Sequence, residues 1–321
     1  MIKDLVSIIT PCYNSAGFVH RLLESILIQD YPFIEIFAID DGSTDNTKEI
    51  IESYIPKFQK RGYELTYIYQ KNAGQAAALN RGLKLISGEY LTWPDSDDYY
   101  NKKDSISVFV RSIQQLDYSY GAVCFIGTFV DDIYLKDLKW NYNYNKSDKL
   151  FEASILGGCL AVPINYMIST TAFERVNPQR EIYTERRPQN MQMFMPLFYY
   201  YKCKTYKESL CNIVVRNNSD SHLIKPYEEQ IDDLQGYLDI QLNTLDNMLI
   251  SDRDKWKNIC KRHITREKCR VAILFEKYHD AVIYKKILSD IGEKLPYKTL
   301  IKIQILRWPR LLRMFKLLKL L

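Results

Sequence analysis

Several features that would place this chain in a specialised class are missing from its sequence. Its seven cysteines form no Cys-x-x-Cys pair, which argues against a zinc site or a disulfide framework and favours reduced thiols. No apolar run approaches the ~20 residues that a membrane-spanning helix needs. No charged leader with an apolar core precedes the first strand-like run, so a secretion signal is not expected. We therefore expect a cytoplasmic globular protein, with one large domain and an appendage or with two domains.

The positive charge of the chain is concentrated at one end. The net charge is +5, but residues 296–321 alone contain seven basic residues and no acidic one. The rest of the chain is therefore slightly acidic, which argues against a nucleic-acid partner. No internal repeat and no low-complexity linker is present.

The most informative stretch is a β-like run at residues 89–93 that leads into three carboxylates, Asp95, Asp97 and Asp98. Like charges at this spacing repel one another, so a fold that keeps them together needs a compensating cation. Alternation along an extended backbone places Asp95 and Asp97 on the same side. Their oxygens suit Mg²⁺ or Mn²⁺, which keep open positions for substrate phosphates. A solvated acidic loop is the alternative interpretation of the same motif.

The first 130 residues alternate strand and helix patterns, which predicts a parallel α/β sheet with helices on both faces. Ligands of such sheets bind beyond the carboxyl ends of the strands. Each predicted strand is followed by polar residues, so four loops are expected to form one binding rim. The strands are predicted at residues 5–10, 34–39, 65–69 and 89–93, and the polar residues after them are Tyr13 and Asn14, residues 40–43, Lys71, Asn72 and Gly74, and the acidic triplet.

The later part of the chain divides into further segments. Residues 122–130 are predicted to form one buried strand, and the small residues of 157–171 to form a loop near the ligand. From residue 225 onward the pattern is helical and densely charged. We predict three parts: residues 1–222 as the α/β domain, 223–295 as a helical extension and 296–321 as a basic amphipathic helix.

In their order and spacing, the motifs of residues 4–220 resemble the inverting family-2 glycosyltransferases of the GT-A fold, of the bacterial surface-polysaccharide type. This Rossmann-like fold has a mostly parallel sheet with helices on both faces. The motifs that carry the resemblance are residues 6–14, residues 24–27 with Gln29 and Tyr31, residues 40–45, Asn72 and Gly74 with Asn80 and Gly82, residues 88–90, and residues 95–98.

The resemblance implies a nucleoside diphosphate sugar as donor, with a UDP-sugar expected, and a hydroxyl of a glycan or lipid-linked sugar as acceptor. Asp41 is expected to accept a hydrogen bond from the base, although an acid in a turn or helix cap is an alternative interpretation. Asp97 is the expected ligand of Mn²⁺ or Mg²⁺, with Asp95 as helper and His222 as a further candidate, while Asp98 is expected to cap the following helix. The nucleotide site is expected to contain Pro11, Tyr13, Asn14, Asp41, Lys71, Asn72 and Asp95.

The general base cannot be assigned by position. Many relatives carry a Glu-Asp pair at the start of a late helix, where this chain has Gln189 and Asn190, and an amide does not accept a proton at neutral pH. Glu185 and Glu181 are the candidates, with the alternative that both are loop acids paired with Arg180, Arg186 or Arg187. Arg186 and Arg187 either face the diphosphate or lie on the surface.

Two other functions remain as hypotheses. A catalytically inactive nucleotide-sugar-binding protein would keep the donor site and lack the base. A nucleotidyltransferase is disfavoured because no Gly-rich phosphate loop follows the first strand.

The C-terminal segment predicts contact with a membrane surface. Arg310, Arg313, Lys316 and Lys319 recur at three-residue steps with apolar residues between them, after an interfacial aromatic residue at Trp308. A helix of this kind lies in the interface of an anionic leaflet. We therefore expect peripheral association with the inner face of the cell membrane, with a homodimerising or core-docked helix as the alternative.

Overall fold

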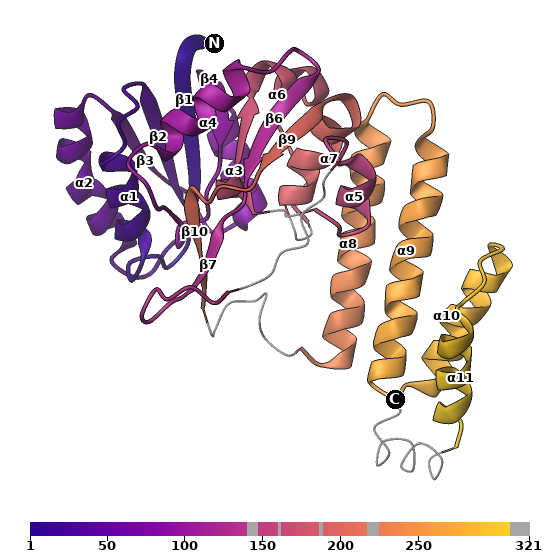
Figure 1. Cartoon of the computed structure of the whole chain (residues 1–321). Coiled ribbons are helices and arrows are strands. Elements are labelled where there is room, and N and C mark those ends of the chain that lie inside the picture. Colours follow the sequence, from indigo (N-terminus) through magenta and orange to yellow (C-terminus); the bar gives the residue numbers. More distant parts are fainter. Residues whose placement is uncertain (140–146, 160–161, 186–188, 217–224, 309–321) are drawn as a thin grey trace. The chain divides into compact units, whose positions relative to one another are not determined.

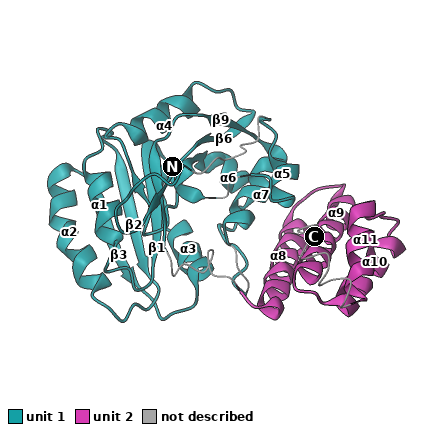
Figure 2. Cartoon of the chain, turned by 60° about the horizontal axis from the view of Figure 1, so that its bottom comes forward, with its two compact units in different colours: residues 1–185, 189–223 teal, residues 186–188, 224–321 magenta. Residues whose placement is uncertain are grey.

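The computed structural model describes residues 1–139, 147–159, 162–185, 189–216 and 225–308 (Figure 1). The chain divides into two compact units (Figure 2). The first contains residues 1–185 and 189–223, and the second contains residues 186–188 and 224–321. The seven cysteines are free, and all except Cys159 are buried.

The first unit is built on a seven-stranded sheet with the order β3-β2-β1-β4-β8-β6-β9. Neighbouring strands are parallel except at β8, which is antiparallel to both β4 and β6. This mostly parallel sheet confirms the predicted fold class. Its strands are β1 (Ile2–Cys12), β2 (Ile34–Asp40), β3 (Glu64–Tyr69), β4 (Gly88–Thr92), β6 (Tyr120–Phe125), β8 (Tyr166–Ser169) and β9 (Lys202–Tyr206).

Helices pack on both faces of the sheet, and its strands are therefore buried on both sides. Ile8 of β1 belongs to the core that includes Leu22, Phe58 and Phe109 of three helices. The next residue, Ile9, faces the opposite side, where it meets the helix that contains Gly82. The helices of this unit are α1 (Val19–Leu27), α2 (Thr47–Arg61), α3 (Gln75–Leu83), α4 (Ser105–Gln114), α5 (Phe151–Ile155), α6 (Thr170–Val176) and α7 (Asn190–Tyr200).

Two predicted elements are wrong. The strand expected at residues 122–130 breaks after Phe125, and a new strand, β7 (Thr128–Asp131), enters a separate three-stranded sheet with the order β5-β10-β7. The other strands of this small sheet are β5 (Tyr99–Tyr100) and β10 (Cys211–Val215). The loop expected at 157–171 contains β8, whose buried Met167 and Ile168 lie between β4 and β6 in the large sheet. Its apolar run is too short to stand out among the neighbouring small residues.

Over its described residues 225–308, the second unit has the helices α8 (Tyr227–Asn247), α9 (Arg253–Leu274), α10 (Tyr278–Asp290) and α11 (Tyr297–Leu306). α9 packs against both α8 and α10, and α11 contributes Ile303 and Leu306 to the shared core. Among the residues that the structure describes, no helix is both long and apolar enough to cross a bilayer. The basic positions from Arg310 onward lie outside the described residues.

Candidate active site

The carboxyl ends of the first four strands meet at one edge of the large sheet. β1, β2 and β3 are in parallel register there, with Cys12 beside Asp40 and Asp40 beside Tyr69. β4 runs parallel to β1 on its other side. The loops that follow these strands therefore lie together, as the sequence predicts, and we call them the rim loops: residues 13–18, 41–46, 70–74 and 93–98.

Asp41 ties the second rim loop to the third. Its carboxylate accepts hydrogen bonds from the backbone N–H groups of Ala73 (2.9 Å) and Gly74 (2.8 Å) and from Gln70 Nε2 (2.7 Å). Gly42 permits this approach, because its φ is +81° and a Cβ there would lie 2.7 Å from the backbone nitrogen of Asn72. Asn72 and Lys71 are thus held, exposed, beside Asp41.

Asn14 ties the first rim loop to the second. Its Oδ1 accepts from the backbone N–H of Thr44 (2.8 Å), and its own N–H donates to Ser43 Oγ (2.9 Å). Tyr13 beside it is 53% exposed, whereas Pro11 is buried under the loop. The structure therefore brings the six predicted nucleotide residues of these three loops to one rim. It leaves Tyr13, Lys71 and Asn72 with surfaces open to a ligand.

The acidic residues lie on the fourth rim loop. Gln75, the first residue of α3, donates to Asp95 through its Nε2 (2.6 Å), and Ser96 Oγ lies 2.9 Å from Ser15 Oγ. Asp98 is buried and accepts from the backbone N–H of Val214 in β10 (2.9 Å). Asp98 therefore anchors β10 and does not cap the following helix.

Crowding and burial make the acids of this loop hard to ionise together. Burial, followed by the charge of Asp97, raises the pKa of Asp95 to about 7. Burial and the charges of Asp97 and Asp95 also raise the pKa of Asp98. Among the described residues, the side chain that forms an ion pair with these acids is Arg216, whose Nε lies 2.7 Å from Asp97 Oδ2. Among the residues that the structure describes, one guanidinium stands against these three carboxylates, so the loop can accommodate a divalent cation.

The carboxylate oxygens of the acidic loop would fill only part of the coordination shell of that cation. Within the described ranges, no group of three His, Cys, Asp or Glu side chains is arranged to hold a metal ion. Asp97 and Asp95 would be the protein ligands, and substrate phosphates and water would supply the others, as Mg²⁺ and Mn²⁺ sites commonly allow. The third predicted ligand, His222, lies outside the described residues.

Asn190, which the resemblance places where a base would be expected, lies near the acidic loop. Its Oδ1 accepts from Trp93 Nε1 (3.0 Å), two residues before Asp95. Gln189 beside it is buried. Glu185 is exposed and accepts from the hydroxyl of Tyr183 (3.0 Å), whose backbone is held by Gln192 in the first turn of α7. Glu185 thus sits on a segment that is anchored beside the start of α7.

Glu181 lies at a different place. Its Oε1 is 3.5 Å from Lys84 Nζ, just beyond the end of α3, whereas Asp95 is bonded at the beginning of that helix. Nine helical residues span about 13 Å, so the structure does not bring Glu181 to the acidic loop. Arg180 is also at this far end, where it pairs with Glu174 and donates to the carbonyl groups of Leu83 and Ile86. Arg186 and Arg187 lie outside the described residues.

Several residues of the site carry no signal that sequence reasoning detects. Gln75 and Arg216 reach the acidic loop only through the tertiary fold. Asn80 has a structural explanation, because its amide exchanges two hydrogen bonds of 2.8 Å with the backbone of Ile182. This clamp holds the segment that leads to Glu185.

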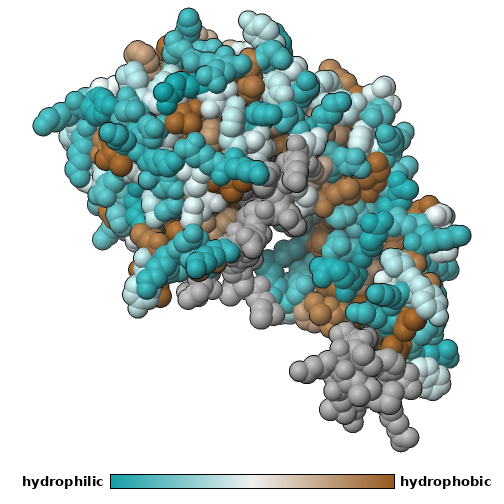
Figure 3. Space-filling model, in the orientation of Figure 1, coloured by the Kyte–Doolittle hydropathy of each residue, from teal (hydrophilic) through white to brown (hydrophobic). Residues whose placement is uncertain are grey.

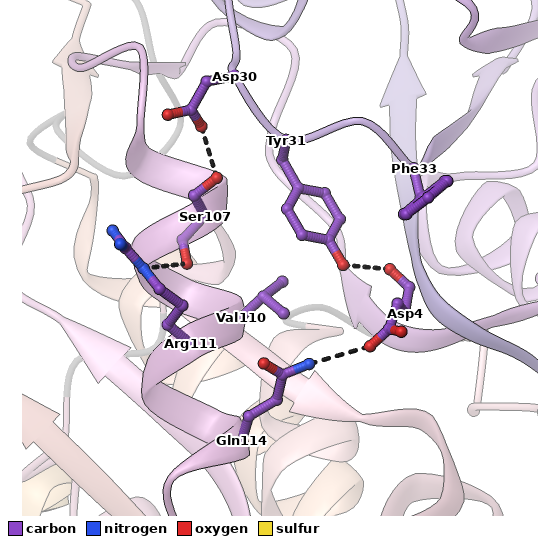
Figure 4. Close-up of a pocket in the computed structure, with 8 residues that line it drawn as sticks. All are labelled: Asp4, Asp30, Tyr31, Phe33, Ser107, Val110, Arg111 and Gln114. Carbon is purple, nitrogen blue, oxygen red and sulfur yellow. Dashed lines mark hydrogen bonds between the residues drawn. The ribbon is translucent and has the colours of Figure 1, made fainter.

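A separate hollow of about 270 Å³ lies near the amino end of β1, between Asp4, residues 30–33 and α4 (Figure 4). The Tyr31 hydroxyl donates to the backbone carbonyl of Asp4, and Gln114 Nε2 donates to the Asp4 carboxylate (3.0 Å). Because the rim loops follow the carboxyl end of β1, this hollow is not part of the candidate site.

The sheet order, the single rim of loops and the acidic loop after β4 are those of a GT-A fold. The protein-family model described as "Glycosyl transferase family 2" matches residues 7–209. The chain belongs to this family, as its motifs predict.

Relatives and solved structures agree with this assignment. Glycosyltransferase GlyA of Streptococcus pneumoniae is 33% identical over 157 residues, which are 49% of this chain and 20% of GlyA. The putative teichuronic acid biosynthesis glycosyltransferase TuaG of Bacillus subtilis is 38% identical over 104 residues, 32% of this chain and 40% of TuaG. The matched regions thus span less than half of either relative.

Two solved structures share the fold. S. aureus TarS 1-349 in complex with UDP-GlcNAc matches 95% of this chain and 87% of that chain, with a TM-score of 0.65 and 17% identity. The mannosyltransferase PcManGT from Pyrobaculum calidifontis, in complex with GDP-Man and Mn²⁺, matches 94% of this chain and 79% of that chain, with a TM-score of 0.59 and 16% identity.

Proposed function

We propose that this protein is a metal-dependent inverting glycosyltransferase. It transfers a sugar from a nucleoside diphosphate sugar, with UDP as the nucleotide, to a hydroxyl of a glycan or lipid-linked acceptor. The observation that carries the proposal is the acidic loop, which is bonded through Asp95 to α3 and lies on the same rim as Asp41 and Asn72. A nucleotide diphosphate needs a pocket for its nucleobase beside a site that holds the metal ion and the diphosphate. The neighbours bound to UDP-GlcNAc and to GDP-Man with Mn²⁺ support it.

Each part of the site has a role in the proposed reaction. Tyr13, Asp41, Lys71 and Asn72 bind and orient the nucleoside, and Asp97 with Asp95 holds Mn²⁺ or Mg²⁺. When bound, the ion acts as a Lewis acid that offsets the charge developing on the leaving diphosphate. Glu185 is the candidate base that takes the proton of the acceptor hydroxyl during in-line attack. Assembly of a cell-surface polysaccharide is the proposed setting, supported by the likeness to TuaG.

The test is thermal melting of the full chain with nucleoside diphosphates and their sugars, with and without Mn²⁺. UDP and a UDP-sugar should raise the melting temperature only when Mn²⁺ is present, and Asp97→Asn should remove the shift. If no nucleotide gives a metal-dependent shift, the proposal fails.

A second candidate function is supported by Asn190, whose amide accepts from Trp93 where an acid would be expected. A binding protein without catalysis would keep the melting shift and lack transfer. Turnover of a UDP-sugar that disappears in Asp97→Asn excludes this candidate, whereas binding without any turnover across acceptors favours it.

A further inference from the structure

Arg216 is delivered to the acidic loop by strand β10. The strand is fixed beside the loop by the hydrogen bond from Val214 N–H to Asp98, two residues before Arg216. The guanidinium of Arg216 lies over the ring of Phe18, 4.4 Å from its centroid, while Nε lies 2.7 Å from Asp97 Oδ2. Arg216 is therefore held between the first rim loop and the predicted metal ligand.

The Arg216 and Asp97 side chains lie at hydrogen-bond distance but are not aligned for a hydrogen bond. The Arg216 and Asp97 side chains are 34% and 14% exposed, respectively, and the buried Arg216 Nε is not aligned for a hydrogen bond with Asp97 or another described residue, despite the short distance. A permanent arginine–carboxylate pair is usually a two-pronged, well-aligned hydrogen-bonded fork. The geometry here is that of a charge-driven contact, which a stronger competitor for Asp97 can displace.

A divalent ion is such a competitor, but its binding to Asp97 is opposed by the positive charge of Arg216. To use Asp97 it must displace the guanidinium or remain close to it, and like charges within a few ångströms repel strongly in a partly buried site. A diphosphate changes this balance, because its oxygens attract the ion and also suit a guanidinium. The ion and the nucleotide should consequently bind together better than the ion binds alone.

We propose that Arg216 is a positioning residue that occupies Asp97 when no donor is bound and thereby couples binding of the divalent ion to binding of the nucleotide diphosphate. This inference rests on the proposed function, because it needs the metal and the nucleotide to bind at the rim. Coupling of this kind is reciprocal: the nucleotide raises the affinity for the ion by the same factor as the ion raises the affinity for the nucleotide.

The experiment measures Mn²⁺ binding to the full chain from the electron paramagnetic resonance signal of free Mn²⁺, with and without UDP. Arg216→Gln should bind Mn²⁺ alone at least tenfold more tightly than the wild type, because the competing charge is gone. The factor by which UDP tightens Mn²⁺ binding should fall at least threefold in this variant. Arg216→Lys keeps the charge and should stay within about threefold of the wild type, which separates charge from loss of packing on Phe18.

Arg21→Gln is the matched control. Arg21 Nη2 forms a partly buried ion pair of 2.8 Å with Asp132, and neither residue belongs to the acidic loop. This variant removes a comparable cation and should bind Mn²⁺ like the wild type. Asp97→Asn should lose Mn²⁺ binding in both states, which locates the measured ion at this loop.

The outcomes separate the two proposals. Equal Mn²⁺ affinity of Arg216→Gln and the wild type, with binding lost in Asp97→Asn, overturns the role of Arg216 and leaves the metal site standing. Absence of Mn²⁺ binding to the wild type even with UDP overturns the metal-dependent function and this inference with it. A tenfold gain in Arg21→Gln as well would show a general charge effect and would also overturn the role of Arg216.

Discussion

At the scale of single residues, the identity of the general base decides whether the site is catalytic. Glu185 is the carboxylate nearest in the chain to the start of α7, and its bond from Tyr183 fixes it on a segment held by Gln192 and Asn80. Glu181, the other candidate from the sequence, is placed with Lys84 beyond the far end of α3. The two residues therefore form a natural pair of test and control.

We predict that Glu185→Gln lowers kcat about 100-fold or more, the usual worth of a positioned base, and leaves UDP affinity unchanged. Glu181→Gln should keep kcat within about twofold, because its side chain is not at the acidic loop. The measurement is sugar release and transfer from a UDP-sugar, with UDP binding followed by calorimetry. An unchanged kcat in Glu185→Gln would remove this residue from the mechanism.

Asp45 supports the second rim loop through its charge. It accepts from the backbone N–H groups of Thr47 and Ala16 (both 3.1 Å) and from the Thr47 hydroxyl (2.5 Å). Although partial burial opposes it, these hydrogen bonds lower the pKa of Asp45. A carboxylate with a lowered pKa in the folded state stabilises the fold above its unfolded pKa, and this stabilisation is lost as the pH falls through the folded value.

Asp45→Asn should therefore reduce the free energy of unfolding by about 1 kcal/mol at pH 7, a modest value because the side chain is exposed. The difference from the wild type should shrink as the pH falls below about 4, where Asp45 itself becomes protonated. Urea unfolding at several pH values measures it. A difference that is constant from pH 7 to pH 3 would show that the charge of Asp45 is not the cause.

At the scale of elements, helix α3 links the core to the site. It begins with Gln75, which donates to Asp95 of the acidic loop, and near its other end Gly82 packs directly on β1. A Cβ at Gly82 would lie 2.4 Å from Ile9 Cγ2, and Ile9 is fully buried. The close approach of helix and strand therefore depends on the absence of a side chain.

Gly82→Ala should destabilise the protein by about 1–3 kcal/mol, because overpacking of the buried Ile9 outweighs the ~1 kcal/mol gain in helix propensity. Gly17→Ala is the control, since a Cβ there meets nothing within 4 Å. Thermal and urea unfolding of both variants measure the effect. A Gly82→Ala variant as stable as the wild type would contradict this close packing.

Elements that depend on local sequence patterns can be predicted from the sequence, whereas those that depend on contacts between distant residues cannot. The first four strands and their polar loops can be predicted because long apolar runs end in charged or turn-forming residues. β8 could not be predicted, because its burial comes from β4 and β6, two strands distant in the chain. The bonds of Asp95 to Gln75 and of Asp97 to Arg216 likewise join distant residues and leave no local pattern.

At the scale of the whole molecule, the helical second unit exposes apolar side chains together with basic ones. Figure 3 shows apolar side chains among hydrophilic ones on its surface. The exposed large apolar residues of this unit include Ile283 and Ile287 of α10, Tyr297 and Ile301 of α11, and Trp308. Lys298 and Lys302 lie on α11 among them, and the basic residues from Arg310 to Lys319 follow. We propose that this end of the chain rests on an anionic membrane surface.

A chain that ends at Trp308 tests this proposal, because it keeps α11 with its buried Ile303 and Leu306 and removes the basic positions from Arg310 onward. Arg310, Arg313, Lys316 and Lys319 should each add about 1 kcal/mol on an anionic leaflet. The full chain should therefore co-sediment with vesicles containing phosphatidylglycerol and much less with pure phosphatidylcholine, and high salt should release it. The shortened chain should lose most of this binding. Equal pelleting of the two chains would refute the membrane role, and a dimer that only the full chain forms in sedimentation velocity would favour a dimerising helix instead.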